Sequence, residues 1–202
     1  MGTLSPMWNW LLRGISSYRA IACLPPFALT VITLYNEAEH HLVIWPSGIF
    51  IVLFGVSLRL WATKHIGRRM LWMKKKGKKL IKTGPYAIVR NPLYIGNITI
   101  AAGLSILSEL IWIVPLVIIY VFILYHFVAL YEEKKLLERW GEEYSAYLSK
   151  IPRWIPNLKT LSLSRSGGFK WRDAIRSEIP SVYVSLFAIL MFVMKEFLSH
   201  MN

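Results

Sequence analysis

Cysteine, acidic side chains and familiar catalytic motifs are scarce in this sequence, and each scarcity removes a class of protein. The single cysteine, Cys23, excludes a disulfide within the chain and a metal site built from several thiolates. The five histidines lack metal-binding spacing, so we expect no metal site; they are His40, His41, His65, His126 and His200. No phosphate-binding glycine loop and no serine nucleophile elbow occurs in the sequence, which argues against those two classes of enzyme.

Apolar residues are abundant, and they gather in long runs. Hydrophobic residues make up 55% of the chain, which is too much for a soluble domain of this size. Runs able to cross roughly 30 Å of hydrocarbon lie near residues 20–35, 42–62, 93–107, 110–131 and 181–198. The first and third are short, and Gly96 and Gly103 in the third indicate a kink, a tilt or close helix packing. We therefore predict an all-α fold, an integral membrane helical bundle of about five transmembrane helices.

Basic residues lie almost entirely on one side of these spans. Of the 24 Lys and Arg, 23 fall in connections on one side, and only Lys195 lies toward the other. Because basic residues near span ends are retained in the cytoplasm, we place the N-terminus inside and the C-terminus outside. The formal charge of +13 is therefore explained mostly by topology. The basic residues lie beside spans and form no recognisable nucleic-acid fold, so we expect no nucleic-acid partner.

The connection 62–84 contains the densest basic run, within residues 74–82. Anionic lipid headgroups are one partner for it, since each basic residue near a charged bilayer surface contributes about 1 kcal/mol of attraction. The alternative is that the end of the run forms one wall of a cofactor pocket; these residues are Lys78, Lys79, Leu80 and Ile81.

Segment 84–96 places polar, turn-forming residues just before the third span. Pro85 and Pro92 restrict their own backbone φ and bias the preceding residues toward extended geometry. The polar side chains of the segment would then be rigidly held, which suits a ligand-binding site. A rigid interfacial turn with its tyrosines in the aromatic belt is the alternative interpretation.

The fourth span ends in a run rich in carboxylates. We expect its helix to continue out of the membrane and to carry Glu132 just past the interface. There the side chain would be partly desolvated and close to segment 84–96, where a carboxylate can hold a cation or an ammonium group.

Two ordered motifs carry a resemblance to a known family. The first reads Gly-Pro-Tyr-x-x-x-Arg-x-Pro-x-Tyr-x-Gly and begins at Gly84. The second begins at Glu132 and reads Glu-Glu-x-x-Leu-x-x-x-Trp-Gly-x-x-Tyr-x-x-Tyr, followed by a Pro-x-x-x-Pro tail. Over residues 63–156 the chain resembles the isoprenylcysteine carboxyl methyltransferase and phospholipid methyltransferase group of integral membrane enzymes.

The resemblance implies an S-adenosylmethionine-dependent methyltransferase with a cofactor pocket on the cytoplasmic side and an acceptor that enters from the bilayer. It places cofactor contacts at Lys78, Lys79, Leu80, Ile81, Tyr86, Asn91, Pro92, Leu93, Tyr94 and Glu132. We assign catalytic roles to Arg90 and Glu132.

Two positions depart from the isoprenylcysteine enzymes. Asn91 stands where those enzymes usually have His, and Val128 stands where they have an arginine that meets the substrate carboxylate. We therefore expect a lipid or another membrane-embedded acceptor, a phospholipid amine being the leading candidate.

We divide the chain into a two-span region (1–62), a methyltransferase core (63–160) and a basic linker with a C-terminal transmembrane helix (161–202). The expected partners are the lipophilic acceptor and membrane lipids. Three alternatives remain open. They are an isoprenylcysteine carboxyl methyltransferase proper, an NADPH-dependent membrane reductase resembling sterol reductases, and a non-catalytic membrane adaptor that uses residues 74–82 and a helix over residues 169–178.

Overall fold

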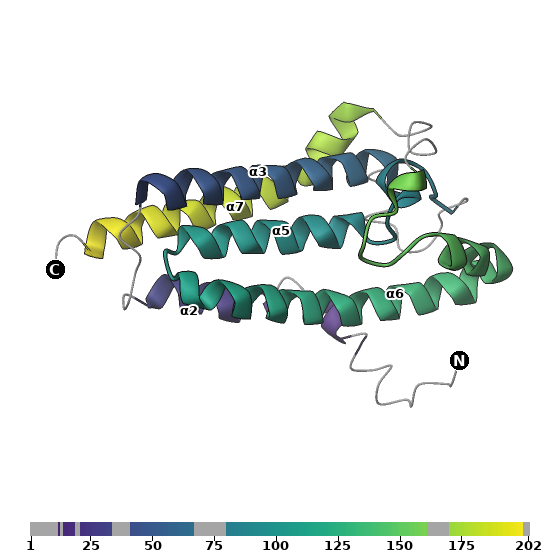
Figure 1. Ribbon diagram of the computed structural model, residues 1–202, viewed down its shortest axis with the longest axis horizontal. Coiled ribbons are helices and arrows are strands. Elements are labelled where there is room, and N and C mark those ends of the chain that lie inside the picture. Colours follow the sequence, from purple (N-terminus) through teal and green to yellow (C-terminus); the bar gives the residue numbers. More distant parts are fainter. Residues whose placement is uncertain are drawn as a thin grey trace.

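The computed structural model describes residues 12, 14–18, 21–33, 41–66, 80–160 and 170–199. Helices account for 86% of these residues and no strand occurs among them, which confirms the predicted all-α fold. The main helices are α2 (Leu24–Ile32), α3 (His41–Ile66), α5 (Pro92–Leu107), α6 (Val114–Lys150) and α7 (Trp171–Ser199). Two short 3-10 helices, η1 (Gly84–Ala87) and η2 (Ile111–Ile113), precede α5 and α6. Helix α5 lies between α3 and α6, and α7 runs alongside α3 (Figure 1).

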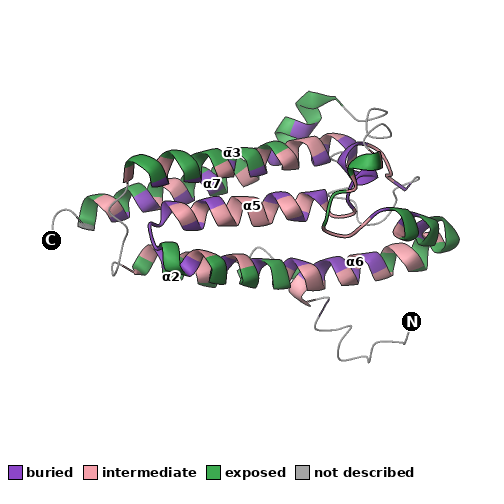
Figure 2. Cartoon of the chain, in the orientation of Figure 1, coloured by how far each residue is buried: buried purple, intermediate pink, exposed green. Residues whose placement is uncertain are grey.

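Among the described helices, α3, α6 and α7 are long and apolar enough to cross a membrane. Exposed stretches follow the outward faces of these helices (Figure 2). They carry large apolar side chains such as Leu42, Phe50 and Phe187. Exposing so much apolar surface to water is unfavourable, whereas contact with lipid hydrocarbon carries no such cost. The chain is therefore an integral membrane protein, as predicted.

The predicted spans correspond to helices with different bounds. The second and third spans match α3 and α5 closely, and the fourth continues into a helix of 37 residues. The last helix begins at Trp171, whereas the sequence pattern indicated residue 181. The first span corresponds to α2, which has nine residues and so extends only about 14 Å. A helix of that length is too short to cross the hydrocarbon alone.

Helices α3 and α5 pack antiparallel with their backbones in close approach. Gly55 of α3 faces Gly96 of α5, and Gly48 of α3 faces Gly103 of α5. A methyl group added at Gly55 would lie 2.9 Å from the Gly96 carbonyl oxygen, and one at Gly103 would lie 2.9 Å from the Gly48 carbonyl oxygen. The glycines of each helix are two turns apart and so share one face. They allow a contact between backbones that larger side chains would prevent.

A buried polar network attaches α7 to this helix pair. Arg59 Nε donates to Glu178 Oε2 at 2.8 Å, and Thr63 Oγ1 donates to Glu178 Oε1 at 2.6 Å. The same arginine donates to Asn97 of α5 and, at 2.9 Å, to Ser181 Oγ. Separating these groups would leave charges buried without partners, which fixes the position of α7 against α3. Arg59, which falls within the predicted span 42–62, is therefore a mostly buried charge on α3.

Helix α6 bends near its C-terminal end. Gly141 has a φ of 48° and a ψ of −122°, a conformation that side chains with a Cβ rarely adopt. The last turns of the helix therefore leave the axis of α6 (Figure 1). Tyr144 and Tyr147, which follow the bend, pack on Leu80. The bend thus brings the end of α6 to the segment that precedes η1.

Candidate active site

Segment 84–96 forms a tight turn between α3 and α5. Pro85 and Pro92 lie in the first turns of η1 and α5, where a missing backbone N–H has no cost. Gly84 has a φ of 64°, and a methyl group added there would lie 2.3 Å from the His65 ring. Glycine is therefore needed both for the backbone conformation and for contact with α3.

The chain that follows α6 holds this turn from the other side. The backbone N–H of Arg90 donates to the Pro152 carbonyl at 2.9 Å. The backbone N–H of Asn157 donates to the Ile88 carbonyl, also at 2.9 Å. The tail of the second sequence motif is therefore a backbone clamp on the first motif.

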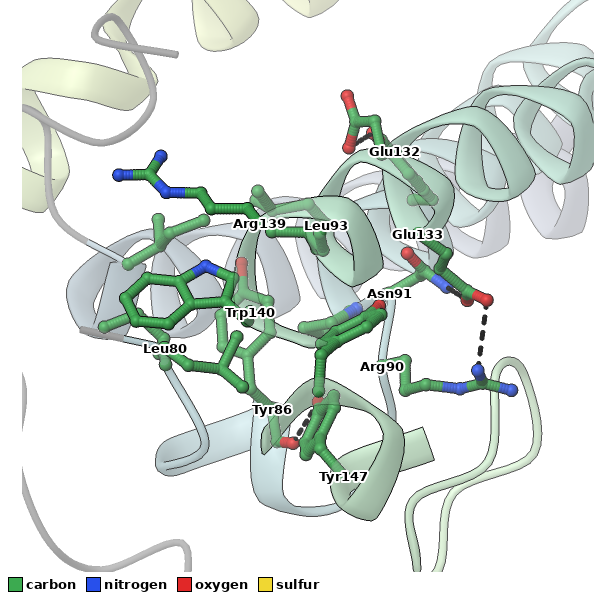
Figure 3. A pocket seen from close by; sticks show the side chains of 16 residues that line it. Leu80, Tyr86, Arg90, Asn91, Leu93, Glu132, Glu133, Arg139, Trp140 and Tyr147 are labelled. Carbon is green, nitrogen blue, oxygen red and sulfur yellow. Dashed lines mark hydrogen bonds and ion pairs between the residues drawn. The ribbon is translucent and has the colours of Figure 1, made fainter. Parts of the chain in front are cut away.

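A cavity of about 170 Å³ opens between this turn, the start of α5 and the outgoing part of α6. Side chains from all three elements surround it (Figure 3). Its lining includes nine of the predicted site residues: Leu80, Ile81, Tyr86, Arg90, Asn91, Pro92, Leu93, Tyr94 and Glu132. Lys78 and Lys79 lie outside the described residues. The two motifs, which are far apart in sequence, thus meet at one cavity.

Glu132 stands on the α6 wall of the cavity. Its Oε2 accepts a hydrogen bond from the Tyr94 hydroxyl of α5. The Tyr94 ring stacks on Tyr125 with the ring centroids 4.9 Å apart, which positions the hydroxyl. The carboxylate is only partly buried, so it combines a fixed position with access from the cavity.

Glu133, the next residue, is buried and binds two arginines. Its Oε2 accepts from Arg90 Nη1 at 3.0 Å and from Arg153 Nη2 at 2.9 Å, and its Oε1 accepts from Arg153 Nε at 3.0 Å. Hydrogen bonds to the Glu133 carboxylate raise the pKa of the Arg153 guanidinium. Figure 3 shows Glu133 directed toward Arg90, while Glu132 points elsewhere. Glu133 therefore ties the turn, α6 and the tail together.

Two buried polar atoms on residues that line the cavity have no hydrogen-bond partner among the described residues. They are the Tyr86 hydroxyl and Arg90 Nε. Burial raises the pKa of the Tyr86 hydroxyl, so this group stays protonated and can donate a hydrogen bond. A buried donor left unpaired costs about 1–3 kcal/mol. Both donors belong to residues of the cavity lining, which suits a ligand with oxygen acceptors.

Seven further residues line the cavity and were not predicted: Ile66, Glu133, Leu136, Arg139, Trp140, Tyr144 and Tyr147. Leu136 and Trp140 follow Glu132 at intervals of four, so helical spacing could have identified them. Tyr144 and Tyr147 reach the cavity because α6 bends at Gly141, which a straight-helix reading does not reveal.

The part of α6 just before Glu132 is apolar and closely packed. Val128 is fully buried and belongs to the same hydrophobic cluster as Tyr94. Two residues before Val128, the His126 Nδ1 atom accepts a hydrogen bond from Trp154 Nε1 at 3.2 Å. Val128 therefore contributes packing to this side of the site, and His126 contributes one hydrogen bond.

Comparison with known proteins identifies relatives of this chain. The family model described as phospholipid methyltransferase matches residues 43–143. The nickel-cobalt-cadmium resistance protein NccN of Alcaligenes xylosoxydans xylosoxydans is 32% identical over 169 residues, which cover 80% of this chain and 72% of that protein. The cobalt-zinc-cadmium resistance protein CzcN of Cupriavidus metallidurans is 30% identical over 120 residues, covering 56% of this chain and 52% of that protein.

A third relative is named for a reaction rather than for a resistance. The protein-S-isoprenylcysteine O-methyltransferase of Saccharomyces cerevisiae is 32% identical over 117 residues, which cover 54% of this chain and 47% of that protein. No solved structure matches the chain. The family match spans half of the chain and includes α3, α5 and most of α6, the helices around the cavity. The chain therefore belongs to the phospholipid methyltransferase family and is an integral membrane methyltransferase.

Proposed function

We propose that this protein transfers the methyl group of S-adenosylmethionine to a lipid or another membrane-embedded acceptor. The observation that carries the proposal is the cavity where both motifs meet, with Glu132 on one wall and two unpartnered donors on its lining residues. Membership of a methyltransferase family supports this assignment over a reductase or a non-catalytic adaptor.

The mixed lining of the cavity suits an amphipathic cofactor. Leu93, Leu136 and Trp140 offer apolar surface, while Tyr86 and Arg90 offer donors. Its volume of about 170 Å³ is below the roughly 300–1,000 Å³ typical of small-molecule sites. A nucleoside-sized ligand therefore has to extend past the described walls, and Lys78 and Lys79 immediately precede Leu80 in the sequence.

The proposed reaction asks for positioning rather than covalent work. When bound, S-adenosylmethionine would supply a methyl group already activated on a sulfonium, so the protein must align the reactants and exclude water. Glu132, held by Tyr94, would orient an ammonium or hydroxyl group of the ligand. Arg90 Nε and the Tyr86 hydroxyl would donate to its carboxylate or hydroxyl oxygens. The apolar side chains of α6 would keep water from the reacting atoms.

Calorimetry of the detergent-purified protein tests the cofactor. We expect S-adenosylhomocysteine to bind and reduced nicotinamide nucleotide not to bind. Glu132→Gln should weaken S-adenosylhomocysteine binding by about 2 kcal/mol, or roughly 30-fold, because it removes a charge from a partly desolvated contact. The protein should stay folded, since the amide oxygen can still accept from Tyr94.

Glu142→Gln is the matched control, because Glu142 is exposed on the same helix and does not line the cavity. It should bind S-adenosylhomocysteine as the unmodified protein does. Equal, small losses in both variants would show that Glu132 belongs to an ordinary solvated face. Binding of the nicotinamide nucleotide alone would replace the proposed reaction by a reduction.

The acceptor is proposed from Val128. A carboxylate substrate drawn into a low-dielectric site needs a paired cation, and the fully buried valine at this position cannot supply one. We expect a membrane lipid extract to be methylated by the protein with radiolabelled donor, and farnesylated N-acetylcysteine not to be. Robust labelling of the farnesylcysteine without labelling of lipids would reverse this assignment.

The cytoplasmic orientation of the cavity is proposed from the distribution of basic residues. Cysteines introduced as Lys76→Cys and Ser166→Cys in a Cys23→Ser background should be shielded from a membrane-impermeant thiol reagent in intact cells. Cysteines introduced as Glu39→Cys and Asn202→Cys should react. Labelling of the position 76 variant from outside would invert the orientation.

A further inference from the structure

At the end of the bundle opposite the cavity, side chains from three elements converge. His41 begins α3, Glu109 lies in the hairpin between α5 and η2, and Glu196 lies in the last turns of α7. His41 Nδ1 is 2.7 Å from Glu109 Oε1 and 3.4 Å from Glu196 Oε1. One nitrogen and two carboxylate oxygens therefore lie within 4.8 Å of one another.

Glu109 is the buried member of this cluster. Its side chain is 2% exposed, and its backbone φ of 63° fits the tight hairpin. Oε1 accepts from Trp45 Nε1 at 2.7 Å in addition to its contact with His41. Oε2 is buried and has no hydrogen-bond partner among the described residues. A buried carboxylate with an unpaired oxygen is costly, so a cation bound at this cluster would offset that cost.

The charges of the described residues around the cluster are of both signs. Lys195 is buried nearby, and its Nζ donates to the Ser108 carbonyl at 2.9 Å. Among the described side chains here, Glu109 and Glu196 supply two carboxylates and Lys195 supplies one ammonium group.

We propose that His41, Glu109 and Glu196 form a binding site for a divalent transition-metal ion such as Zn²⁺. Imidazole nitrogen with carboxylate oxygen is a donor set that suits zinc and its first-row neighbours, whereas Mg²⁺ and Ca²⁺ prefer oxygen alone. Three protein ligands leave a coordination position for water. The bound ion would join α3, the α5–η2 hairpin and α7, far from the methyltransferase cavity. Spacing in the sequence could not indicate this site, because its ligands come from positions 41, 109 and 196.

The test uses the full chain, purified in detergent and freed of metal with a chelator. Titration with ZnCl₂ should give one bound ion per chain and raise the thermal midpoint. Titration with CoCl₂ should produce a visible absorption band that Zn²⁺ removes. His41→Gln and Glu196→Gln should each weaken Zn²⁺ binding about tenfold or more, since even outer groups around metal sites contribute tenfold effects.

Two controls keep the outcome unambiguous. His126→Gln and Glu142→Gln remove the same chemical groups at other places in the molecule and should bind Zn²⁺ as the unmodified protein does. The His41 side chain is 43% exposed, so its replacement does not bury a new polar group. Absence of Zn²⁺ binding to the unmodified protein, or equal affinity in the site and control variants, would overturn the proposal. Unchanged S-adenosylhomocysteine binding by the site variants would confirm that only the far end was altered.

Discussion

On its α3 side, helix α5 presents glycines, whereas on its α6 side it presents Tyr94 at a cavity. Gly96 and Gly103 allow the α3 and α5 backbones to touch, and an added Cβ would meet carbonyl oxygens directly. Two residues from Gly96, Tyr94 holds α6 at the distance set by two stacked rings. On one face, α5 therefore packs directly against a neighbouring helix, and on the opposite face it lines a cavity.

The difference shows how a small membrane protein combines a rigid support with a binding site. Helices in lipid gain no hydrophobic energy from approaching each other, so close backbone packing must supply the attachment. At its glycines, the α3–α5 contact does this with backbone atoms, and the hydrogen bond from Arg59 to Asn97 adds to it. The α5–α6 side can then hold its polar groups, Glu132 and Glu133 among them, around a cavity.

Disrupting the glycine contact between α3 and α5 should have the largest effect, a loss of stability. Gly103→Val would place side-chain atoms against the backbone of Val52 and Gly48, where an added Cβ already lies 2.8 and 2.9 Å from main-chain atoms. We expect a loss of about 3 kcal/mol of stability, because neither backbone can move without separating the helices. The thermal midpoint in detergent measures this.

Gly14→Ala is the control for this variant, since no described atom lies within 4 Å of the added methyl group. It should leave the midpoint nearly unchanged. Equal midpoints for the two variants would mean that the α3–α5 contact is looser than the glycines indicate.

Removing the ion pairs of Glu133 on the cavity side should have an intermediate effect, which we expect on ligand binding. Glu133→Ala leaves Arg90 and Arg153 without their shared carboxylate, and both arginines are less than one-third exposed. We expect S-adenosylhomocysteine binding to weaken by about 2 kcal/mol, because the turn and the tail lose their common partner.

Glu143→Ala provides the comparison for Glu133. It removes the carboxylate that pairs with Lys82 at 2.8 Å, where both side chains are at least 40% exposed. Surface pairs of this kind contribute about 0–1 kcal/mol, so binding should hardly change. A similar loss of binding in both variants would show that Glu133 acts through its charge alone and not by holding the turn and the tail together.

Altering the bend in α6 should have the smallest effect on stability. Gly141→Ala forces a Cβ onto a residue with a φ of 48°, although no described atom lies within 4 Å of it. We expect a cost of about 1 kcal/mol from the backbone alone. Affinity for S-adenosylhomocysteine should fall as well, because Tyr144 and Tyr147 follow the bend into the cavity. An unchanged affinity would mean that Tyr144 and Tyr147 do not contact the ligand.

Much of the fold could be predicted because hydrophobic runs and basic residues report on helices and the membrane directly. The helices α3, α5 and α6 follow the apolar pattern, and Pro92 marks the start of α5. The sequence pattern predicted a helix at 169–178 and a separate span at 181–198, whereas the structure has one helix, α7, that continues through Pro180.

The candidate site was predicted as far as its motifs extend. Tyr86, Asn91 and Glu132 carry recognisable spacing, and all three line the cavity. Glu133 was missed because adjacent residues on a helix face different directions, and the sequence does not tell which of two glutamates turns toward Arg90. The cluster of His41, Glu109 and Glu196 depends entirely on tertiary contacts, so no local sequence pattern could indicate it.

The hydrogen bonds between the tail and the turn determine the order in which parts of this protein can assemble. The turn is held by the backbone of the tail and by Thr160 Oγ1, which donates to the Ala87 carbonyl at 2.6 Å. A ribosome makes the turn first and the tail some seventy residues later, after α5 and α6. During synthesis, therefore, α3, α5 and α6 can enter the bilayer while the turn is still unclamped. The cavity can therefore take its final form only after the tail has been made, when the helices around it are already complete.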